Sequence, residues 1–515
     1  MLRSPKLILD EFIGDGPTLI AEAWNLTPHL ETGLEIAARL AFSGVNVDYL
    51  FYGNKLPLPE GYSETGKIKL FGFNLPFIRS PEQFGIAQLI EIKRKFNLPI
   101  NIVECPMPIS SLNLDEVLPD HFLDSVDSLK QAKYLDSSSF GLSIASSLIS
   151  AFRDACIRPI KHKQYCLSLA ANYIYAYHFV SDLIKINKYK SVVLFNGRFS
   201  SLKGAVEAAR AHSLNIYYHE RGANMNKFFF KSYQPHDLNA IQRDILCVWN
   251  EAQLKFGNSA VLIAKQFFED QSRAIDQGWK SFVADQEINS AEPFLKMAQG
   301  LSLSGKVVVY FSSSNDEWAA TGYTNISPFG SQIEAVEALY SACKHNGHSL
   351  IIRIHPNQPA SENALWNKLL LLENLIIVPS HCKASSYYLL QSSDVVATYG
   401  STVGVESVYW GKPSILLSLC LYSNIGVSVV SPKDCHELTQ ILASIDSIPV
   451  DNVTSYKYGF YFKNHGVDFF FYQPESLFSG CFNGFNLQYN FVRGCLSMAI
   501  RLRSFVKRIL GKLVS

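Results

Sequence analysis

The chain has 515 residues, 48% of them apolar and 18% charged, and its 46 basic and 45 acidic side chains leave a net charge of +1. This composition excludes a disordered chain, and the length allows two or three domains with sizeable cores. Balanced charge also excludes an overall positive field, so we expect no nucleic-acid partner.

The ten cysteines extend from Cys105 to Cys495 without a C-x-x-C pair or a Cys/His cluster at zinc spacing. This pattern predicts reduced thiols in a cytoplasmic protein, with no metal site and no cofactor. The start of the chain lacks the apolar run and cleavage site of a signal peptide. No stretch reaches the ~18 consecutive apolar residues that a transmembrane helix needs.

The N-terminal part is predicted to open as a β-loop-α-β unit. A strand over 18–23 is followed by Thr27 as a helix cap, by Pro28 at the first helical position, and by a second strand over 47–52. Further elements are predicted as a helix over 81–96, a strand over 100–104, helices over 140–157 and 165–184, a strand over 191–196, a helix to about 211 and a strand over 215–219.

Polar side chains follow two strands of this first domain. Asn196 and Arg198 come at the end of one strand, and Glu220 and Arg221 come directly after His219 at the end of the next. Because parallel strands end at the same edge of a sheet, we expect these side chains to share that edge.

A second βα pattern begins near residue 300, after long helical patterns over 237–300. Its elements are predicted as strands over 306–311, 349–354, 376–378, 395–398 and 414–417, with a helix over 331–346 among them. We therefore predict an N-terminal domain over 1–300 with helical insertions, a C-terminal domain over 301–445, and an extension over 446–515 that packs back on the first domain.

One stretch, residues 392–417, organises the second domain. A short strand enters the turn Tyr399–Thr402, and a helix opens there. Gly400 allows the backbone to approach a ligand closely, while Ser401 and Thr402 stand where a helix N-terminus offers free N–H groups. The pattern predicts an anion-binding site.

Three strand-end motifs of the second domain are predicted to meet at one edge of its sheet. They are Ser312, Ser313 and Ser314; His355 and Pro356; and Gly400, Ser401 and Thr402, with Glu406 one helical turn further on. Hydroxyls, an imidazole and a helix start suit a nucleotide, and Glu406 would accept hydrogen bonds from its ribose. Taken singly, each residue also fits a structural role such as a turn, a helix cap or a solvated helix position.

These motifs resemble a known family. Ser-Ser-x-Asp-Glu, Arg-x-His-Pro-Asn, the run from Ser393 to Glu406 and Tyr-Trp-Gly-Lys-Pro are similar to motifs of the capsule and surface polysaccharide biosynthesis glycosyltransferases. The resemblance covers about 307–417 and is weaker around 195–199 and 219–222. The His-Pro and Ser/Thr motifs also resemble those of transferases that use CMP-sialic acid, CMP-Kdo or CDP-polyols.

The resemblance implies an α/β fold of GT-B type, with two Rossmann-like domains facing across a cleft. It implies that the first domain holds the acceptor and the second the nucleotide-sugar donor. By the same resemblance, His355, Ser401 and Thr402 would contact the donor phosphate and Glu406 the ribose. The lack of an Asp-x-Asp motif agrees with metal-independent donor binding.

Transfer of a sugar to a hydroxyl also requires a base and a group that stabilises the leaving phosphate. Glu220 is the first candidate for the base, with Asp316 and Glu317 as rivals. Arg198 and Arg221 would orient anionic groups, with Asn196 beside them. A structural ion pair between Glu220 and Arg221 is an equal alternative.

The sequence therefore predicts a glycosyltransferase that moves a sugar, with a CMP-sugar favoured as donor, to a growing capsule or lipopolysaccharide glycan, free or lipid-linked. A CDP-polyol phosphotransferase and a nucleotide-sugar epimerase are alternative enzymes. A glycan-binding scaffold in polysaccharide export is the alternative that is not an enzyme.

The segment 491–515 predicts binding to an anionic membrane surface, on the inner face of the cytoplasmic membrane. It carries six basic and no acidic residues, and its apolar residues share one side of a helical wheel. Each basic residue near such a surface contributes about 1 kcal/mol. Burial of the same apolar side in a groove of the first domain is the alternative.

Deleting residues 491–515 is expected to release the protein from anionic liposomes, because the deletion removes six positive charges together with the apolar side. Cosedimentation with vesicles of anionic and of zwitterionic lipid measures the effect. Equal sedimentation of the full and the shortened chain would rule out this role for the segment.

Overall fold

The computed structural model describes most positions between residues 9 and 486. The positions left undescribed within that range are 10–11, 13–15, 25–27, 53–54, 59, 61–80, 107–112, 276–285, 287–302, 324–325, 357, 359–365, 367–368, 370–371, 373–374 and 477–478, together with the side chains of 81–88 and 317–318. The segment 491–515 discussed above lies outside the described residues.

Two compact units make up the chain. Unit 1 comprises Met1–Pro235, Ala320–Gly322 and Gly466–Ser515, and unit 2 comprises His236–Ala319 and Tyr323–His465. The chain thus leaves unit 1 at residue 235, whereas the sequence placed a boundary near 300, and residues 446–465 belong to unit 2 rather than to an extension.

Helix packing explains the position of this division. The helices α8 (Leu238–Phe256), α9 (Asn258–Ser272) and α17 (Tyr456–Asn464) share a small apolar core. Gly459 allows close approach, because a Cβ added there would lie 2.5 Å from the Phe268 ring and 2.6 Å from the Ala264 carbonyl oxygen. Residues 238–272 therefore belong with the helix of unit 2 that buries them.

Unit 1 contains, among the described residues, a seven-stranded sheet in the order β12-β6-β5-β4-β1-β2-β3. The strands are β1 (Thr18–Glu22), β2 (Val47–Phe51), β3 (Ile100–Val103), β4 (Ser191–Phe195), β5 (Asn215–Arg221), β6 (Lys227–Lys231) and β12 (Val467–Asp468). Neighbours from β3 to β5 are parallel, and β6 and β12 add antiparallel pairs at one edge. The chain adds β2 and β3 on one side of β1 and β4 and β5 on the other, so the switch point lies between β1 and β4.

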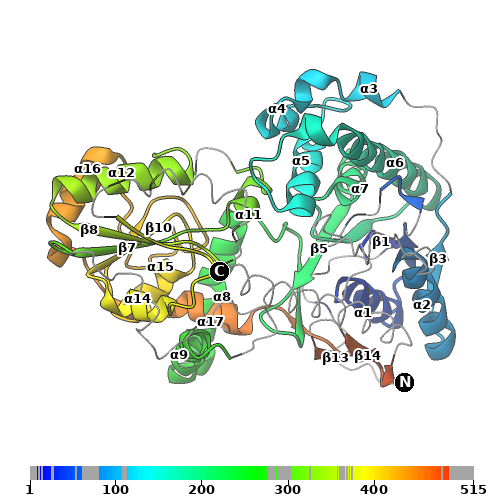
Figure 1. Ribbon diagram of the computed structural model, residues 1–515. Helices are drawn as coiled ribbons and strands as arrows, with labels where there is room; N and C mark the ends of the chain where they lie inside the picture. Colours follow the sequence, from blue (N-terminus) through cyan, green and yellow to red (C-terminus); the bar gives the residue numbers. More distant parts are fainter. Residues whose placement is uncertain are drawn as a thin grey trace, which may run out of the picture. The chain divides into compact units, whose positions relative to one another are not determined.

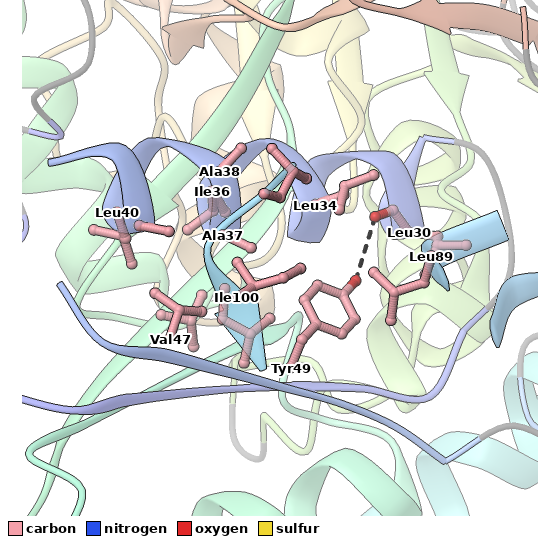
Figure 2. Packing of buried hydrophobic residues seen from close by; sticks show 14 of the residues in the cluster. Leu30, Leu34, Ile36, Ala37, Ala38, Leu40, Val47, Tyr49, Leu89 and Ile100 are labelled. Carbon is pink, nitrogen blue, oxygen red and sulfur yellow. Dashed lines mark hydrogen bonds between the residues drawn. The ribbon is translucent and has the colours of Figure 1, made fainter. Parts of the chain in front are cut away.

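Helices cover both faces of this sheet (Figure 1). The helices α1 (His29–Phe42) and α2 (Pro81–Phe96) pack on one face, and α6 (Lys163–Asn187) and α7 (Ser200–Ala211) on the other. Figure 2 shows the α1 face, where Leu34, Ala37 and Leu40 lie over the strands. The Tyr49 hydroxyl donates to the Leu30 carbonyl oxygen at 3.4 Å in the same view.

The remaining described elements of unit 1 are short or peripheral. They are α3 (Leu114–Val117), η4 (Asp120–Leu123), α4 (Val126–Lys130), α5 (Ser139–Phe152), η5 (Pro159–His162), β13 (Tyr472–Ser476), β14 (Ser479–Phe482) and β15 (Phe485–Asn486).

A buried carboxylate fastens the C-terminal segment to unit 1. The side chain of Glu35 in α1 is fully buried and accepts backbone hydrogen bonds from Phe470 at 2.7 Å and from Phe471 and Tyr472 at 2.8 Å. Arg39 donates to the same carboxylate at 2.7 Å and to the Asp468 carbonyl oxygen. The aromatic residues 469–472 are thus held on unit 1.

Unit 2 contains, in its described part, a five-stranded parallel sheet in the order β11-β10-β7-β8-β9. The strands are β7 (Val307–Phe311), β8 (Ser349–Arg353), β9 (Leu375–Val378), β10 (Val395–Thr398) and β11 (Ser414–Leu416). The helices α12 (Gln332–His345) and α16 (Cys435–Ala443) pack on one face, and α14 (Ser386–Ser392) and α15 (Val403–Tyr409) lie on the other (Figure 1). The switch point lies between β7 and β10.

The predicted fold class is confirmed, since each unit is a Rossmann-like, doubly wound α/β sheet. Three local predictions differ from the structure. The helix predicted over 140–157 ends at Phe152, because Arg153 adopts the left-handed conformation there. Helix α1 begins at His29 with Pro28 as its N-cap, one position later than predicted, and β5 continues to Arg221 instead of ending at His219. Pairing with the antiparallel β6, which the sequence pattern missed, extends β5 through Arg221. None of the described helices combines the length and apolar composition that crossing a bilayer requires.

Replacing Glu35→Gln is expected to destabilise unit 1 by roughly 3–5 kcal/mol, because it leaves the buried Arg39 guanidinium without its anionic partner. Urea unfolding followed by far-UV circular dichroism measures the loss. Glu337→Gln, at an exposed position of α12, is the matched control and should change stability by less than about 0.5 kcal/mol. Equal midpoints for the two variants would contradict this role of Glu35.

Candidate functional sites

The carboxyl edge of the unit 1 sheet carries a buried acid–imidazole pair. Glu22 is the last residue of β1, and it lies in the same register row as Phe195 of β4 and His219 of β5. The Glu22 carboxylate and His219 Nε2 are hydrogen-bonded, and both side chains are completely buried. Burial raises the pKa of Glu22, while the charge and hydrogen bond of His219 act in the opposite direction.

The structure brings Asn196 and Glu220 together at this edge, as predicted. Asn196 directly follows β4 in the left-handed region, with φ of 56°, and its amide donates to Glu220 Oε2 at 2.8 Å. Glu220 Oε1 accepts the backbone N–H of Arg221 at 3.0 Å. Both oxygens of the predicted base therefore already accept a hydrogen bond.

The two predicted arginines differ in their surroundings. Burial lowers the pKa of Arg221, although the nearby Glu220 carboxylate opposes this shift. Arg198 donates to the Ser150 hydroxyl at 3.3 Å, and its guanidinium lies 4.4 Å from the centre of the Phe199 ring. Arg221 thus belongs to the polar cluster around Glu220, whereas Arg198 lies on an aromatic surface.

His29 at the start of α1 is a site residue that the sequence analysis missed. Its ring centre lies 3.8 Å from that of Phe195, and its Nδ1 lies 3.7 Å from Glu220 Oε1. Burial lowers the pKa of His29 well below its ordinary value, and the charges of Arg221 and His219 lower it further. The only sequence signal was the Pro28 helix start, which says nothing of what the next side chain meets.

A glycine allows α1 to approach this edge. A Cβ on Gly33 would lie 2.8 Å from Glu22 Oε1 and 2.8 Å from the Tyr49 hydroxyl. The absence of a side chain thus lets the first turns of α1, which carry His29 and the buried Glu31, cover the acid–imidazole pair.

The N-terminus of α7, which follows β4, is capped by the carboxylate of Glu60. Glu60, which is 5% exposed, accepts backbone hydrogen bonds from Ser200 at 3.1 Å and Ser201 at 2.8 Å at the start of α7. The Ser147 and Ser201 hydroxyls donate to it as well. The Glu60 carboxylate therefore takes the place at the N-terminus of α7 where a ligand anion could bind. Burial raises the pKa of Glu60, whereas the hydrogen bonds that it accepts lower this pKa.

The switch point of unit 2 brings together the predicted serine run and the Tyr399–Thr402 turn, because β7 and β10 are direct neighbours. Ser312, Ser313 and Ser314 are all buried. The Ser314 hydroxyl donates to Asp316, and the Ser313 N–H donates to Gln332 Oε1 at 2.7 Å. The buried Ser313 hydroxyl has no hydrogen-bond partner among the described residues.

The His355 turn is tied directly to this run, which confirms that the ends of β7 and β8 meet. The His355 N–H donates to the Ser312 hydroxyl at 2.7 Å, and Pro356 follows in the turn. The Gln358 N–H donates to the His355 carbonyl oxygen at 3.0 Å. The side-chain amide of Gln358, in a residue 7% exposed, has no hydrogen-bond partner among the described residues.

The turn after β10 has the conformation that the sequence predicted. Gly400 has φ of 116°, a conformation that residues with a side chain rarely adopt. Thr402 is exposed at the N-cap of α15, and Ser401 accepts the Val403 N–H at 3.4 Å. The Tyr422 hydroxyl donates to the Ser401 carbonyl oxygen at 2.6 Å, and this hydrogen bond holds the turn in place.

Glu406 is engaged within the protein. Its Oε1 accepts the Thr402 hydroxyl at 3.0 Å, and its Oε2 accepts the Tyr387 hydroxyl at 2.5 Å. The residue is 7% exposed, and burial raises its pKa against these two hydrogen bonds. Its contacts in the structure are therefore those of a residue that fixes the turn, whereas the sequence predicted contact with a ribose.

Within the described part of the chain, no group of three His, Cys, Asp or Glu side chains has a metal-binding arrangement.

Each of the two units contains a doubly wound α/β sheet with polar residues at its carboxyl edge. In proteins of this class, ligands bind at the carboxyl edges of the sheets. No family model matches the sequence, and no curated protein matches it.

Solved structures with some likeness to the chain include two transferases and an epimerase. Thermosulfurimonas dismutans KpsC, a β Kdo 2,7 transferase, is 18% identical over 51% of this chain and 79% of its own, with a TM-score of 0.29. The β Kdo 2,4 transferase of the same organism's KpsC is 13% identical over 52% and 79%, with a TM-score of 0.32. A UDP-GlcNAc 2-epimerase from Neisseria meningitidis is 11% identical over 86% and 97%, with a TM-score of 0.26.

Replacing Glu406→Gln is expected to destabilise unit 2 less at about pH 8 than at about pH 5. The pKa of Glu406 is raised above its ordinary value of 4.5 in the folded protein. At a pH between the unfolded and the folded pKa, folding therefore takes up a proton. The stability that Glu406 contributes is fully present below pH 4.5 and is lost as the pH rises through the folded pKa. Glutamine does not titrate. Urea unfolding of both proteins at the two pH values measures the difference, and a larger loss at the higher pH would contradict the raised pKa.

Proposed function

We propose that the chain is a glycosyltransferase that moves a sugar from a nucleotide-sugar donor to a growing glycan. The observation that carries this proposal is the meeting of three strand-end motifs at the switch point of unit 2, with buried polar groups of Ser313 and Gln358 left without a described partner. Buried polar groups are nearly always paired, so a polar ligand at this edge would satisfy them.

The donor phosphate would bind at the two turns of unit 2. The exposed Thr402 hydroxyl and the Ser401 side chain stand beside Gly400, where the backbone leaves room for a ligand. The His355 side chain follows β8 on the adjacent turn and would supply a proton or a positive charge to the departing phosphate. In this proposal Glu406 holds the Thr402 hydroxyl in place, and contact with the ribose requires one of its remaining lone pairs.

The acceptor would bind at the carboxyl edge of unit 1. This edge carries a carboxylate, an amide and a guanidinium in Glu220, Asn196 and Arg221, which together suit the hydroxyls of a sugar. Trp24, which is partly exposed, packs against the buried Phe199 with ring centres 4.3 Å apart and would offer an apolar surface to a sugar ring. Arg198, on the Phe199 ring, would contact anionic groups of the glycan.

The finer features of the proposal come from the motifs. A CMP-sugar donor, metal-independent transfer, a capsule or lipopolysaccharide glycan as the product, and work at the inner face of the cytoplasmic membrane all follow from the resemblance of the His-Pro and Ser/Thr motifs and from segment 491–515. Donor preference separates this reaction from CDP-polyol transfer and from epimerisation of a UDP-sugar.

Calorimetric titration with CMP, CDP and UDP is expected to show binding, with CMP the tightest. The His355→Ala and Ser401→Ala variants should each weaken that binding roughly 10- to 100-fold, because each loses a hydrogen bond to a charged phosphate. His381→Ala, exposed in the same unit, is the matched control and should bind as the unchanged protein does.

Absence of nucleotide binding at millimolar concentration would overturn the donor site. CDP preference would favour polyol phosphate transfer, and UDP preference would favour a different donor or the epimerase. Unchanged glycan production by cells that carry both His355→Ala and Glu220→Ala would favour the scaffold instead of an enzyme.

A further inference from the structure

Both carboxylate oxygens of Glu220 already accept hydrogen bonds within unit 1. Its Oε2 accepts the Asn196 amide at 2.8 Å and its Oε1 accepts the Arg221 N–H at 3.0 Å. The same contacts fix the carboxylate in one orientation, which is the usual arrangement of a group that positions a neighbouring base.

That neighbour is His29. Its Nδ1 is buried and lies 3.7 Å from Glu220 Oε1, the oxygen on the side of the ring. The ring packs against Phe195 with centres 3.8 Å apart and has the Trp24 ring edge-on at 6.2 Å. Nδ1 is buried without a hydrogen-bond partner among the described residues, whereas Nε2 does not belong to these buried, unpaired atoms.

His29 is also held in the form that accepts a proton. The residue is 7% exposed, and burial lowers its pKa, so that the imidazole is neutral near pH 7. Glu220 faces Nδ1 and favours the tautomer in which Nδ1 carries the hydrogen and Nε2 the lone pair. Other charged or titratable groups lie near the His29 ring and along the carboxyl edge of the unit 1 sheet. They are Arg221 and His219 of β5, Glu22 of β1, Glu31 of α1 and Tyr49 of β2.

We propose that His29 is the catalytic base of the transfer and that Glu220 is its positioning residue. This inference rests on the proposed function and names the group that acts in the acceptor site. Nε2 takes the proton of the acceptor hydroxyl while the oxygen forms a bond to the anomeric carbon of the donor sugar. The bond from that carbon to the phosphate oxygen breaks, and its electron pair leaves with the nucleotide. The imidazolium that forms is stabilised by the Glu220 carboxylate.

The tautomer of His29 is tested first, without any substrate. The full chain is labelled with ¹⁵N at histidine, the His29 signals are assigned by their loss in His29→Gln, and the ring shifts are followed with pH. The proposal expects a neutral ring at pH 7 with the hydrogen on Nδ1, and a shift of the tautomer balance towards Nε2–H in Glu220→Gln. A ring that is protonated at pH 7, or that carries its hydrogen on Nε2 in the unchanged protein, overturns the proposal.

Hydrolysis of the donor, with water in place of the glycan, tests the role in the reaction. CMP-N-acetylneuraminic acid and CMP-Kdo are the probes, and CMP release is measured against pH. We expect His29→Gln to lower kcat by roughly 10²- to 10⁴-fold and to remove the acidic limb of the pH profile. Glu220→Gln should lower kcat less and shift that limb to lower pH, because the imidazolium loses its anionic partner. His121→Gln, exposed in the same unit, is the matched control and should leave kcat unchanged.

CMP titration of the same variants separates the two proposals. His29→Gln with unchanged CMP affinity and lost hydrolysis supports the base, since a misfolded variant would lose both. His29→Gln that hydrolyses both probes at the unchanged rate overturns it while the donor site stands. Failure of the unchanged protein to bind CMP counts against the proposed function, and His29 is then judged by its tautomer alone.

Discussion

Both units depend on the same constraint, the reversal of strand order beside the first strand of a parallel sheet. Strands β1 and β7 each lie inside their sheet, with later strands added on both sides. The loops on the two sides of such a strand turn away from each other, and this leaves room at the carboxyl edge. The polar residues of unit 1 gather at the ends of β1, β4 and β5, and those of unit 2 at the ends of β7, β8 and β10, which are the strands at the reversal and their direct neighbours.

Four buried glutamates show how differently one side chain acts in this fold. Glu35 fastens the returning C-terminal segment to α1, and Glu60 fills the helix start after β4. Glu406 fixes the hydroxyl of the Thr402 turn. Glu22 pairs with His219 beneath the candidate acceptor site. A buried carboxylate costs several kcal/mol unless it is paired, so each one marks a place where two segments are held together.

The two units differ in what they leave open. In unit 1 the helix start after β4 is closed by Glu60, and the accessible chemistry lies with His29 and Glu220. In unit 2 the turn after β10 contains Gly400 with a positive φ and the exposed residue Thr402, and the turns after β7 and β8 have buried polar groups without a described partner. This contrast supports the proposal that the acceptor binds at the edge of unit 1 and the donor at the edge of unit 2.

The sequence by itself determined the α/β class, most strand positions and the three motifs of unit 2, because strand periodicity and strand-end residues are local properties. It also brought Asn196 and Glu220 to one edge, since adjacent parallel strands end together. Only the tertiary structure decided that the chain leaves unit 1 at residue 235, that Glu406 is occupied by Tyr387, and that His29 faces Glu220. Each of these depends on contacts between segments far apart in the chain, such as α9 with α17 or α1 with β5, which no local pattern records.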